Sequence, residues 1–145
     1  MSLKQKVKNN VSCMFGKSLR VKIQQHKNKN YIGSLYGGFF VCLDILPTNP
    51  IIYSFGIGED ISFDLEMLRL TNSTVYAFDP TPKSITYLKT LELPERFIFS
   101  DTAVASIDGN LSFYLPKNPA YVSGSLVTTR NVSTDTIPVK AMKVK

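Results

Sequence analysis

Residues 51–64, IIYSFGIGEDISFD, contain an apolar run, a glycine turn and the start of an apolar-periodic segment in direct succession. The run Ile51–Phe55 ends at a glycine, as a buried parallel strand is expected to do. Asp60 or Ser62 is suited to cap a following helix. The apolar positions of that helix recur at i, i+4 and i+7, at Ile61, Leu65 and Leu68. The stretch therefore predicts a strand, a tight turn and a helix.

The same order of elements is repeated immediately downstream. A second apolar run, Thr74–Phe78, is followed by Asp79 and Pro80. Thr81 before Pro82 makes a favourable N-cap and first helical residue. The apolar side chains expected on one face of this second helix are Ile85, Leu88 and Leu91.

Pro94 is expected to end the second helix, and Arg96–Phe99 then starts a third strand. Strands that alternate with helices through short connections predict an α/β fold with a Rossmann-like parallel sheet. Beyond the third strand, Asp108-Gly109 separates two short apolar runs and predicts a β-hairpin. A polar loop over residues 116–135 and a last alternating strand around residues 137–141 complete the expected pattern.

Charge divides the 145 residues into two parts. Residues 1–50 hold eight basic side chains and one acidic side chain, whereas residues 51–145 hold nine basic and ten acidic ones. We therefore expect a basic leader over 1–50 and an α/β domain over 51–145. The leader predicts an amphipathic helix docked on the domain with its lysines in solvent, followed by short extended segments. Weak contact of this helix with an anionic membrane surface or an acidic substrate is the alternative. The apolar line of that helix is Leu3, Val7, Val11 and Met14.

The bulk composition excludes several classes of protein. No run approaches the roughly 18 apolar residues of a membrane span, and no secretory signal is recognisable, which predicts a cytoplasmic protein. Cys13 and Cys42 lie outside any metal-ligand spacing, so we expect buried thiols and no metal site. The leader lacks aromatic residues before Tyr31, which disfavours specific nucleic-acid binding.

The glycine turn indicates a ligand site at the carboxyl end of the first strand. Gly56 and Gly58 lie where an open α/β sheet binds its ligand. Asp79 ends the second strand, where an acid accepts hydrogen bonds from ribose hydroxyls. The alternative is structural: the glycines allow tight strand-to-helix packing, and Asp79-Pro80 only ends a strand.

The residues around the turn discriminate between nucleotides. Ile61 stands where the dinucleotide pattern GxGxxG has its third glycine, and Glu59 and Asp60 occupy the helix mouth that would receive a pyrophosphate. No GK[ST] sequence follows, which excludes a P-loop. S-adenosylmethionine fits better, because its sulfonium and ammonium groups favour nearby carboxylates. An NAD-dependent oxidoreductase is the weaker alternative.

Three segments resemble the FkbM-type class I methyltransferases: YSFGIGEDISFD, VYAFDPTPKS and FSDTAVASIDGNLSFY. The resemblance covers about residues 36–145. It implies that the first segment is the cofactor loop, that the second carries the ribose-binding acid, and that the third borders the adenine. Ser54 stands at a position usually acidic in class I enzymes, so Glu59 or Asp60 is the candidate for the cofactor ammonium. The implied cofactor-binding residues are Ser54, Phe55, Gly56, Gly58, Glu59, Asp60, Asp79, Pro80, Asp101, Thr102 and Ala103.

The resemblance also implies the reaction, an O-methylation of a sugar or small metabolite. Family members continue into a strand with a DxxKxDxEG-like motif, which does not occur before Lys145. We therefore expect this chain to be the cofactor-binding half, inactive alone, with no catalytic base of its own. An apolar edge on the first strand would favour self-association. A non-catalytic nucleoside-binding module of the same fold is the alternative.

Overall fold

The computed structural model describes residues 27–144, so the predicted amphipathic helix of the leader and Cys13 lie outside the described residues. The elements in chain order are β1 (Asn30–Ile32), β2 (Phe39–Val41), the short 3-10 helix η1 (Leu43–Ile45), β3 (Ile51–Phe55), α2 (Ser62–Leu70), β4 (Thr74–Phe78), α3 (Pro82–Leu88), β5 (Phe97–Ser100), β6 (Ala103–Ala105), β7 (Gly109–Pro116) and β8 (Val132–Lys143).

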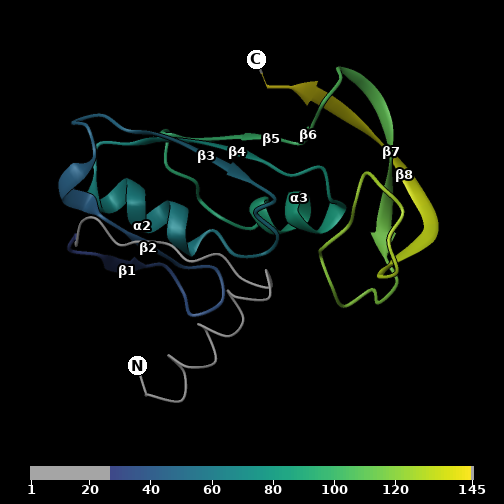
Figure 1. Ribbon diagram of the computed structural model, residues 1–145, viewed down its shortest axis with the longest axis horizontal. Helices are drawn as coiled ribbons and strands as arrows, with labels where there is room; N and C mark the ends of the chain where they lie inside the picture. Colours follow the sequence, from purple (N-terminus) through teal and green to yellow (C-terminus); the bar gives the residue numbers. More distant parts are fainter. Residues whose placement is uncertain (1–26, 145) are drawn as a thin grey trace, which may run out of the picture.

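The predicted parallel sheet is present, with strand order β3-β4-β5. Tyr53 pairs with Tyr76, and Tyr76 pairs with Ile98, so the side chains of these three residues share one face. Helices α2 and α3 cover the other face (Figure 1). The fold is therefore mixed α/β, and successive strands lie progressively outward from β3.

Helix α2 begins one turn after the glycine turn, as predicted. The N-cap residue is Ile61, which makes no side-chain cap bond, so the prediction of Asp60 or Ser62 as the cap is wrong by one residue. Asp60 precedes the cap and supports the helix start, because its Oδ1 accepts a hydrogen bond from the backbone N–H of Ser62 at 2.9 Å. Ile61 is fully buried in the main core cluster, together with Leu68 and Val75. The apolar residues that recur along this segment therefore form the face of α2 that packs on the sheet.

Helix α3 begins at Pro82 as predicted but ends at Leu88, well before Pro94. The backbone N–H of Thr90 bonds to the carbonyl oxygen of Tyr87 at 3.0 Å, and Leu91 bonds likewise to Leu88 at 3.1 Å. These i to i+3 bonds tighten the chain into turns and stop the helix without proline.

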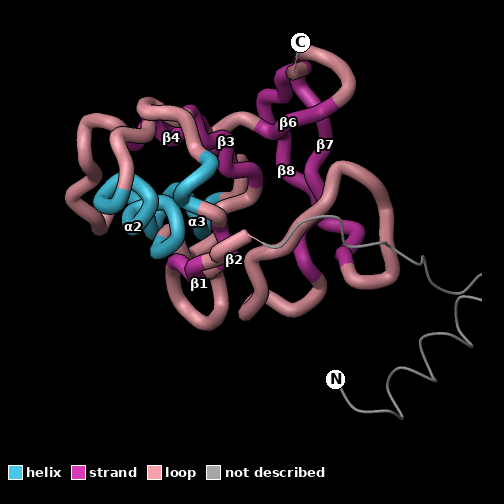
Figure 2. The backbone as a smooth tube through the Cα atoms, turned by 60° about the vertical axis from the view of Figure 1, so that its left-hand side comes forward, coloured by secondary structure: helices cyan, strands magenta, loops and turns pink. Residues whose placement is uncertain are grey.

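The predicted hairpin around Asp108-Gly109 is wrong. Strands β6 and β7 flank that turn but do not pair with each other, because β8 lies between them in the order β6-β8-β7. Asp108 Oδ1 accepts the backbone N–H of Lys143 at 2.8 Å, which ties the turn to the end of β8. The long strand β8, with Val139 and Ala141 buried, takes the place beside β6 that β7 would hold in a hairpin (Figure 2).

Strand β8 is the predicted last strand, and it is longer than expected. It begins at Val132, inside the stretch predicted as a loop, so that loop is limited to residues 117–131. Strand β7 runs antiparallel to β8, and β6 runs parallel to it. Figures 1 and 2 show this second sheet beyond the carboxyl ends of the first.

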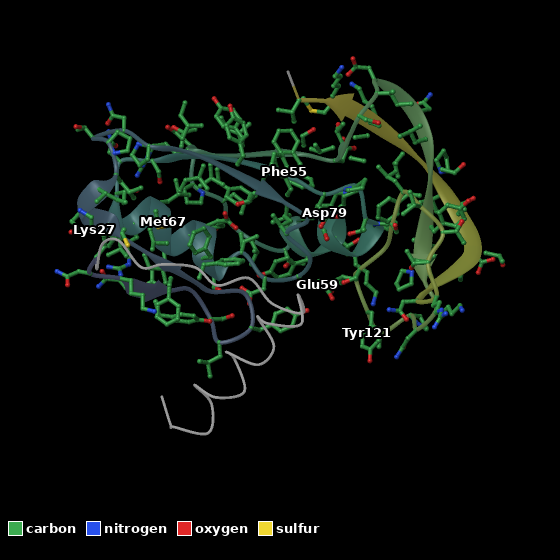
Figure 3. The ribbon with its side chains drawn as sticks, viewed as in Figure 1. Lys27, Phe55, Glu59, Met67, Asp79 and Tyr121 are labelled. Carbon is green, nitrogen blue, oxygen red and sulfur yellow. The ribbon has the colours of Figure 1, made fainter. Side chains whose placement is uncertain are left out.

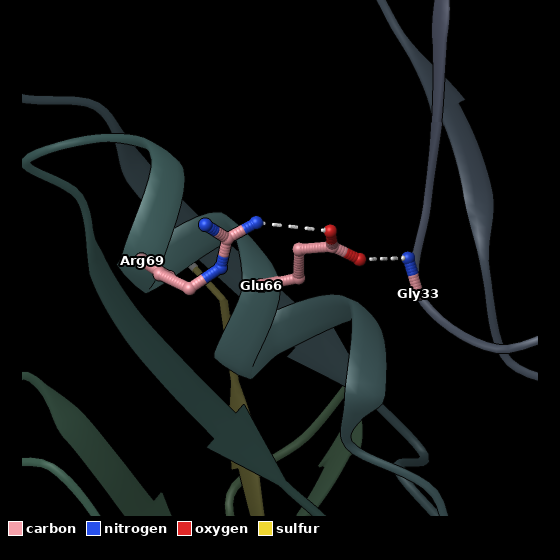
Figure 4. A network of polar contacts seen from close by, with 3 residues as sticks. All are labelled: Gly33, Glu66 and Arg69. Atoms are coloured by element: carbon pink, nitrogen blue, oxygen red, sulfur yellow. Dashed lines mark hydrogen bonds and ion pairs between the residues drawn. The ribbon is translucent and has the colours of Figure 1, made fainter.

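The β1–β2 hairpin packs on α2, on the side opposite the parallel sheet (Figure 1). The backbone N–H of Gly33 donates to Glu66 Oε2 at 2.8 Å, and Glu66 Oε1 also pairs with Arg69 at 3.3 Å (Figure 4). The bond from Gly33 lowers the pKa of Glu66 below its usual value. These contacts place the end of the basic leader beside the helix that follows the glycine turn.

Candidate cofactor site

The glycine turn between β3 and α2 needs glycine for its backbone conformation. Gly56 has φ of +74° and Gly58 has φ of +57°, values that side-chain-bearing residues rarely adopt. A Cβ atom at Gly56 would meet nothing within 4 Å, whereas one at Gly58 would lie 3.2 Å from Val122 Cγ2. Tight strand-to-helix packing therefore does not explain Gly56, which faces open space.

A cavity of about 380 Å³, here called the Asp79 cavity, opens on one side of this turn. It lies at the carboxyl ends of β3 and β4, beside the start of α3, where Figure 3 labels Asp79. Its lining contains seven of the predicted residues: Phe55, Gly56, Gly58, Asp79, Pro80, Thr102 and Ala103. Phe113 and Leu126 add an apolar wall from the second sheet and its loop.

Asp79 is only 3% exposed and is held by hydrogen bonds within the chain. Its Oδ2 accepts the backbone N–H of Gly58 at 2.9 Å. Its Oδ1 accepts the backbone N–H and the hydroxyl of Thr81, at 2.8 and 2.7 Å. A carboxylate has about four acceptor positions, so one remains for a ligand. Asp79 therefore joins the glycine turn to the start of α3 whether or not it also binds a ribose.

A second cavity of about 350 Å³, here called the Asp60 cavity, lies along the other side of the turn. The two cavities share Phe55, Gly56 and Gly58 in their linings. Asp60 and Ser54, both predicted site residues, line the second cavity. The two neighbouring cavities, which share this part of the glycine turn as a wall, are together called the elongated site below.

Asp60 is held as a carboxylate by its neighbours. Burial alone would raise its pKa, but hydrogen bonds from Ser34, Ser62 and Gly37 outweigh burial and lower the pKa. The bond from the Ser34 hydroxyl to Asp60 Oδ2 measures 2.5 Å. The β1–β2 turn therefore positions a negative charge at the rim of the glycine turn.

Asp64 is a second carboxylate of the Asp60 cavity that the sequence analysis did not select. It is 4% exposed on α2 and accepts a hydrogen bond from the Ser54 hydroxyl. Burial raises its pKa, and the bond from Ser54 only partly offsets that effect. The nearby charge of Asp60 raises it further.

We expect Asp64→Asn to increase the free energy of unfolding near neutral pH. A carboxyl group whose pKa is raised in the folded state disfavours folding once the pH rises above its unfolded value of 3.8. The asparagine amide keeps an acceptor for Ser54 without the buried charge. The gain, measured by urea denaturation, should shrink as the pH falls toward 3.8. A destabilisation that is equal at pH 4 and pH 7 would contradict this assignment.

Two predicted residues lie away from both cavities. Glu59 lines a separate hollow with Asp60 and Tyr121, and in the view of Figure 3 it lies between Asp79 and Tyr121. Asp101 is exposed and lines neither cavity, although its neighbours Thr102 and Ala103 line the Asp79 cavity. Asp60, rather than Glu59, is therefore the acid of the glycine turn that reaches the elongated site.

Two distant segments also contribute residues that carried no recognisable motif. Val122 and Ser123, from the loop between β7 and β8, line both cavities. Tyr36 and Gly37, from the turn between β1 and β2, line the Asp60 cavity. A Cβ atom at Gly37 would lie 2.7 Å from Asp60 Oδ2, so this position needs glycine for the close approach of Asp60. The Gly37-Gly38 pair was therefore the one feature of these two segments from which the sequence could have indicated a part of the site.

Comparison of the chain with protein-family models, curated proteins and solved structures finds no match to any of them. Within residues 27–144, no helix is long and apolar enough to span a membrane. Over the same residues, no three of the His, Cys, Asp and Glu side chains gather as a metal site.

Proposed function

We propose that this chain binds S-adenosylmethionine across the glycine turn, as the cofactor-binding part of a methyltransferase. The observation that supports the proposal is the pair of neighbouring cavities that share Gly56 and Gly58 in their linings. One cavity offers a carboxylate at the end of β4 together with an apolar wall. The other contains two carboxylates, Asp60 and Asp64. That division matches a ligand with a nucleoside at one end and a cationic amino acid at the other.

The nucleoside end of the ligand belongs in the Asp79 cavity. The free acceptor position of Asp79 suits a ribose hydroxyl, and Thr102 adds a hydroxyl to the lining of the same cavity. Phe113 and Leu126 supply apolar surface for a base. Ligand sites of this kind are mostly apolar with a few polar groups that fix orientation.

The cationic end belongs in the Asp60 cavity. Asp60 stays ionised at neutral pH, because its pKa is lowered, so it attracts an ammonium or sulfonium group. The same charge repels the pyrophosphate of NAD, which needs bare amides at a helix N-terminus. The site therefore favours S-adenosylmethionine over a dinucleotide.

The proposed reaction is transfer of the cofactor methyl group to a hydroxyl of a sugar or small metabolite, as the FkbM resemblance implies. This chain's residues would hold and orient the cofactor. The acceptor hydroxyl must lose a proton during transfer, and we assign no residue of this chain as that base.

Asp60→Asn tests the proposal, and it should weaken S-adenosylmethionine binding by at least about tenfold, since the loss of one charge-assisted contact costs about 1.4 kcal/mol or more. Asp101→Asn is the matched control, because Asp101 is an exposed acid outside both cavities. Calorimetric titration with S-adenosylmethionine, S-adenosylhomocysteine and NAD compares the three proteins.

Two outcomes of that titration would contradict the proposal. One is NAD binding more tightly than S-adenosylmethionine to the unmodified chain. The other is the absence of any binding by a chain that circular dichroism shows to be folded. The glycine turn and Asp79 would then have only the structural role that the bonds to Gly58 and Thr81 already give them.

A further inference from the structure

Within residues 27–144, no helix packs on one face of the parallel sheet, because α2 and α3 both pack on the opposite face (Figure 1). We call the uncovered surface the open face. Three of its side chains are more than half exposed: Ile51 at 62%, Tyr53 at 60% and Phe55 at 54%. Strand pairing adds to this face Thr74, Tyr76, Phe78, Ile98 and Ser100.

The aromatic side chains of the open face pack against one another in pairs. The rings of Tyr53 and Tyr76 lie 5.6 Å apart with 22° between their planes, and those of Phe55 and Phe78 lie 5.5 Å apart at 35°. Tyr53 also stacks on Phe55 at 6.3 Å. These separations are those of favourable aromatic pairs. The open face is therefore a preorganised, nearly continuous aromatic surface.

No Asp, Glu, Lys or Arg occupies an outward position of β3, β4 or β5. A nucleic acid would need basic groups on such a platform, and this one has none. A second copy of this chain, whose net charge is +6, meets no like charge at this surface. The absence of charge thus favours a partner with the same apolar character.

The size of the open face also matches a pair of copies. Its exposed side chains amount to about 500 Å² per chain, if a full aromatic side chain contributes about 200 Å². Two such faces bury about 1,000 Å², the lower bound for a specific interface. A patch of about 500 Å² is at the upper end of what monomers leave exposed to water.

We propose that two copies of this chain associate through their open faces, sheet against sheet. The contact is isologous: the same surface is used on both copies, related by a two-fold axis. Two twisted sheets then pack about 10 Å apart with their strands about 30° from parallel. Strand β3 pairs only with β4 among the described residues, so its free edge borders the same interface.

Light scattering of the full chain over a concentration series tests this proposal. The unmodified chain should show twice the mass of a single chain and dissociate on dilution. Tyr53→Lys should shift the chain to a single-chain mass at every concentration, because two buried ammonium groups would face each other. Tyr121→Lys is the matched control, since Tyr121 is 64% exposed on the loop between β7 and β8, and it should stay dimeric.

Chemical modification gives a second readout that needs no variant. Nitration of the unmodified chain by tetranitromethane should spare Tyr53 at high concentration and modify it on dilution, whereas Tyr121 should react at both. A single-chain mass at all concentrations overturns the proposal. A monomer with Tyr53 protected also overturns it, and would assign the open face to another segment of the chain.

Discussion

Asp79→Ala is expected to lower the free energy of unfolding by about 3 kcal/mol. Each hydrogen bond to a buried charged acceptor contributes about 1.5–3 kcal/mol, and the donors that lose their acceptor stay buried without a partner. The variant removes the acceptor of Gly58 N–H, Thr81 N–H and the Thr81 hydroxyl. Gly58 then loses the contact that holds its left-handed turn against α3. Such a loss is a large share of the 5–15 kcal/mol typical of a domain.

Urea denaturation of Asp79→Ala, Asp79→Asn and Asp101→Ala checks this expectation. The asparagine variant should be intermediate, because its oxygen still accepts from Thr81 while its amide nitrogen cannot accept from Gly58. Asp101 is exposed, so its alanine variant should fall within about 0.5 kcal/mol of the unmodified chain. Equal stability of all four proteins would mean that the Asp79 network carries no folding energy.

This prediction also bears on how ligand binding is tested. Loss of S-adenosylmethionine binding in Asp79→Ala has two causes that a titration alone does not separate, a missing ribose contact and a displaced glycine turn. Asp60→Asn leaves the Asp79 network intact, since Asp60 shares no hydrogen bond with Asp79. The charge at Asp60 is therefore the cleaner test of the cationic ligand.

Ile61→Ala is expected to lower the free energy of unfolding by about 3–4 kcal/mol, within the range for truncation of a buried isoleucine. Ile61 is 0% exposed and packs in the cluster with Leu68 and Val75, at the junction of the glycine turn and α2. Its carbonyl oxygen accepts the N–H of Leu65 at 3.0 Å, and alanine preserves that bond. The cost therefore reports the cavity left by the side chain.

Thermal or urea unfolding of Ile61→Ala is compared with Ile107→Ala, which removes the same atoms from a side chain that is 54% exposed. The exposed variant should change stability by about 0.5 kcal/mol or less. A loss below about 1 kcal/mol for Ile61→Ala would show that the core relaxes around the missing side chain. Ile61 also stands at the third glycine of the dinucleotide pattern, and its burial shows that the position is used for packing.

Local sequence patterns predicted the parallel sheet and its helices, because the apolar residues of each strand or helix recur within a few positions. The glycine turn and the start of α3 at Pro82 lie where expected. Each depends on neighbours close in sequence. The end of α3 was placed too late, because Pro94 marks only a limit beyond which a helix cannot continue.

Long-range pairing was not predictable from the chain alone. Asp108-Gly109 is a sound hairpin signal, yet β8 competes for both flanking strands and pairs with each of them. Strand choice depends on the side chains buried across the pair, here Val139 and Ala141. Those contacts join residues about 30 positions apart and have no local signature.

The candidate site divides in the same way. Short stretches of the sequence predicted a glycine turn after the first strand, an acid at the end of the second strand and a carboxylate just before α2, because each is a property of a few consecutive residues. Tertiary packing places Asp60 rather than Glu59 in the lining of the Asp60 cavity, and it adds Val122 to that lining from a distant loop. Side-chain direction at a turn and contacts between distant segments depend on how the whole chain packs, and no short pattern encodes them.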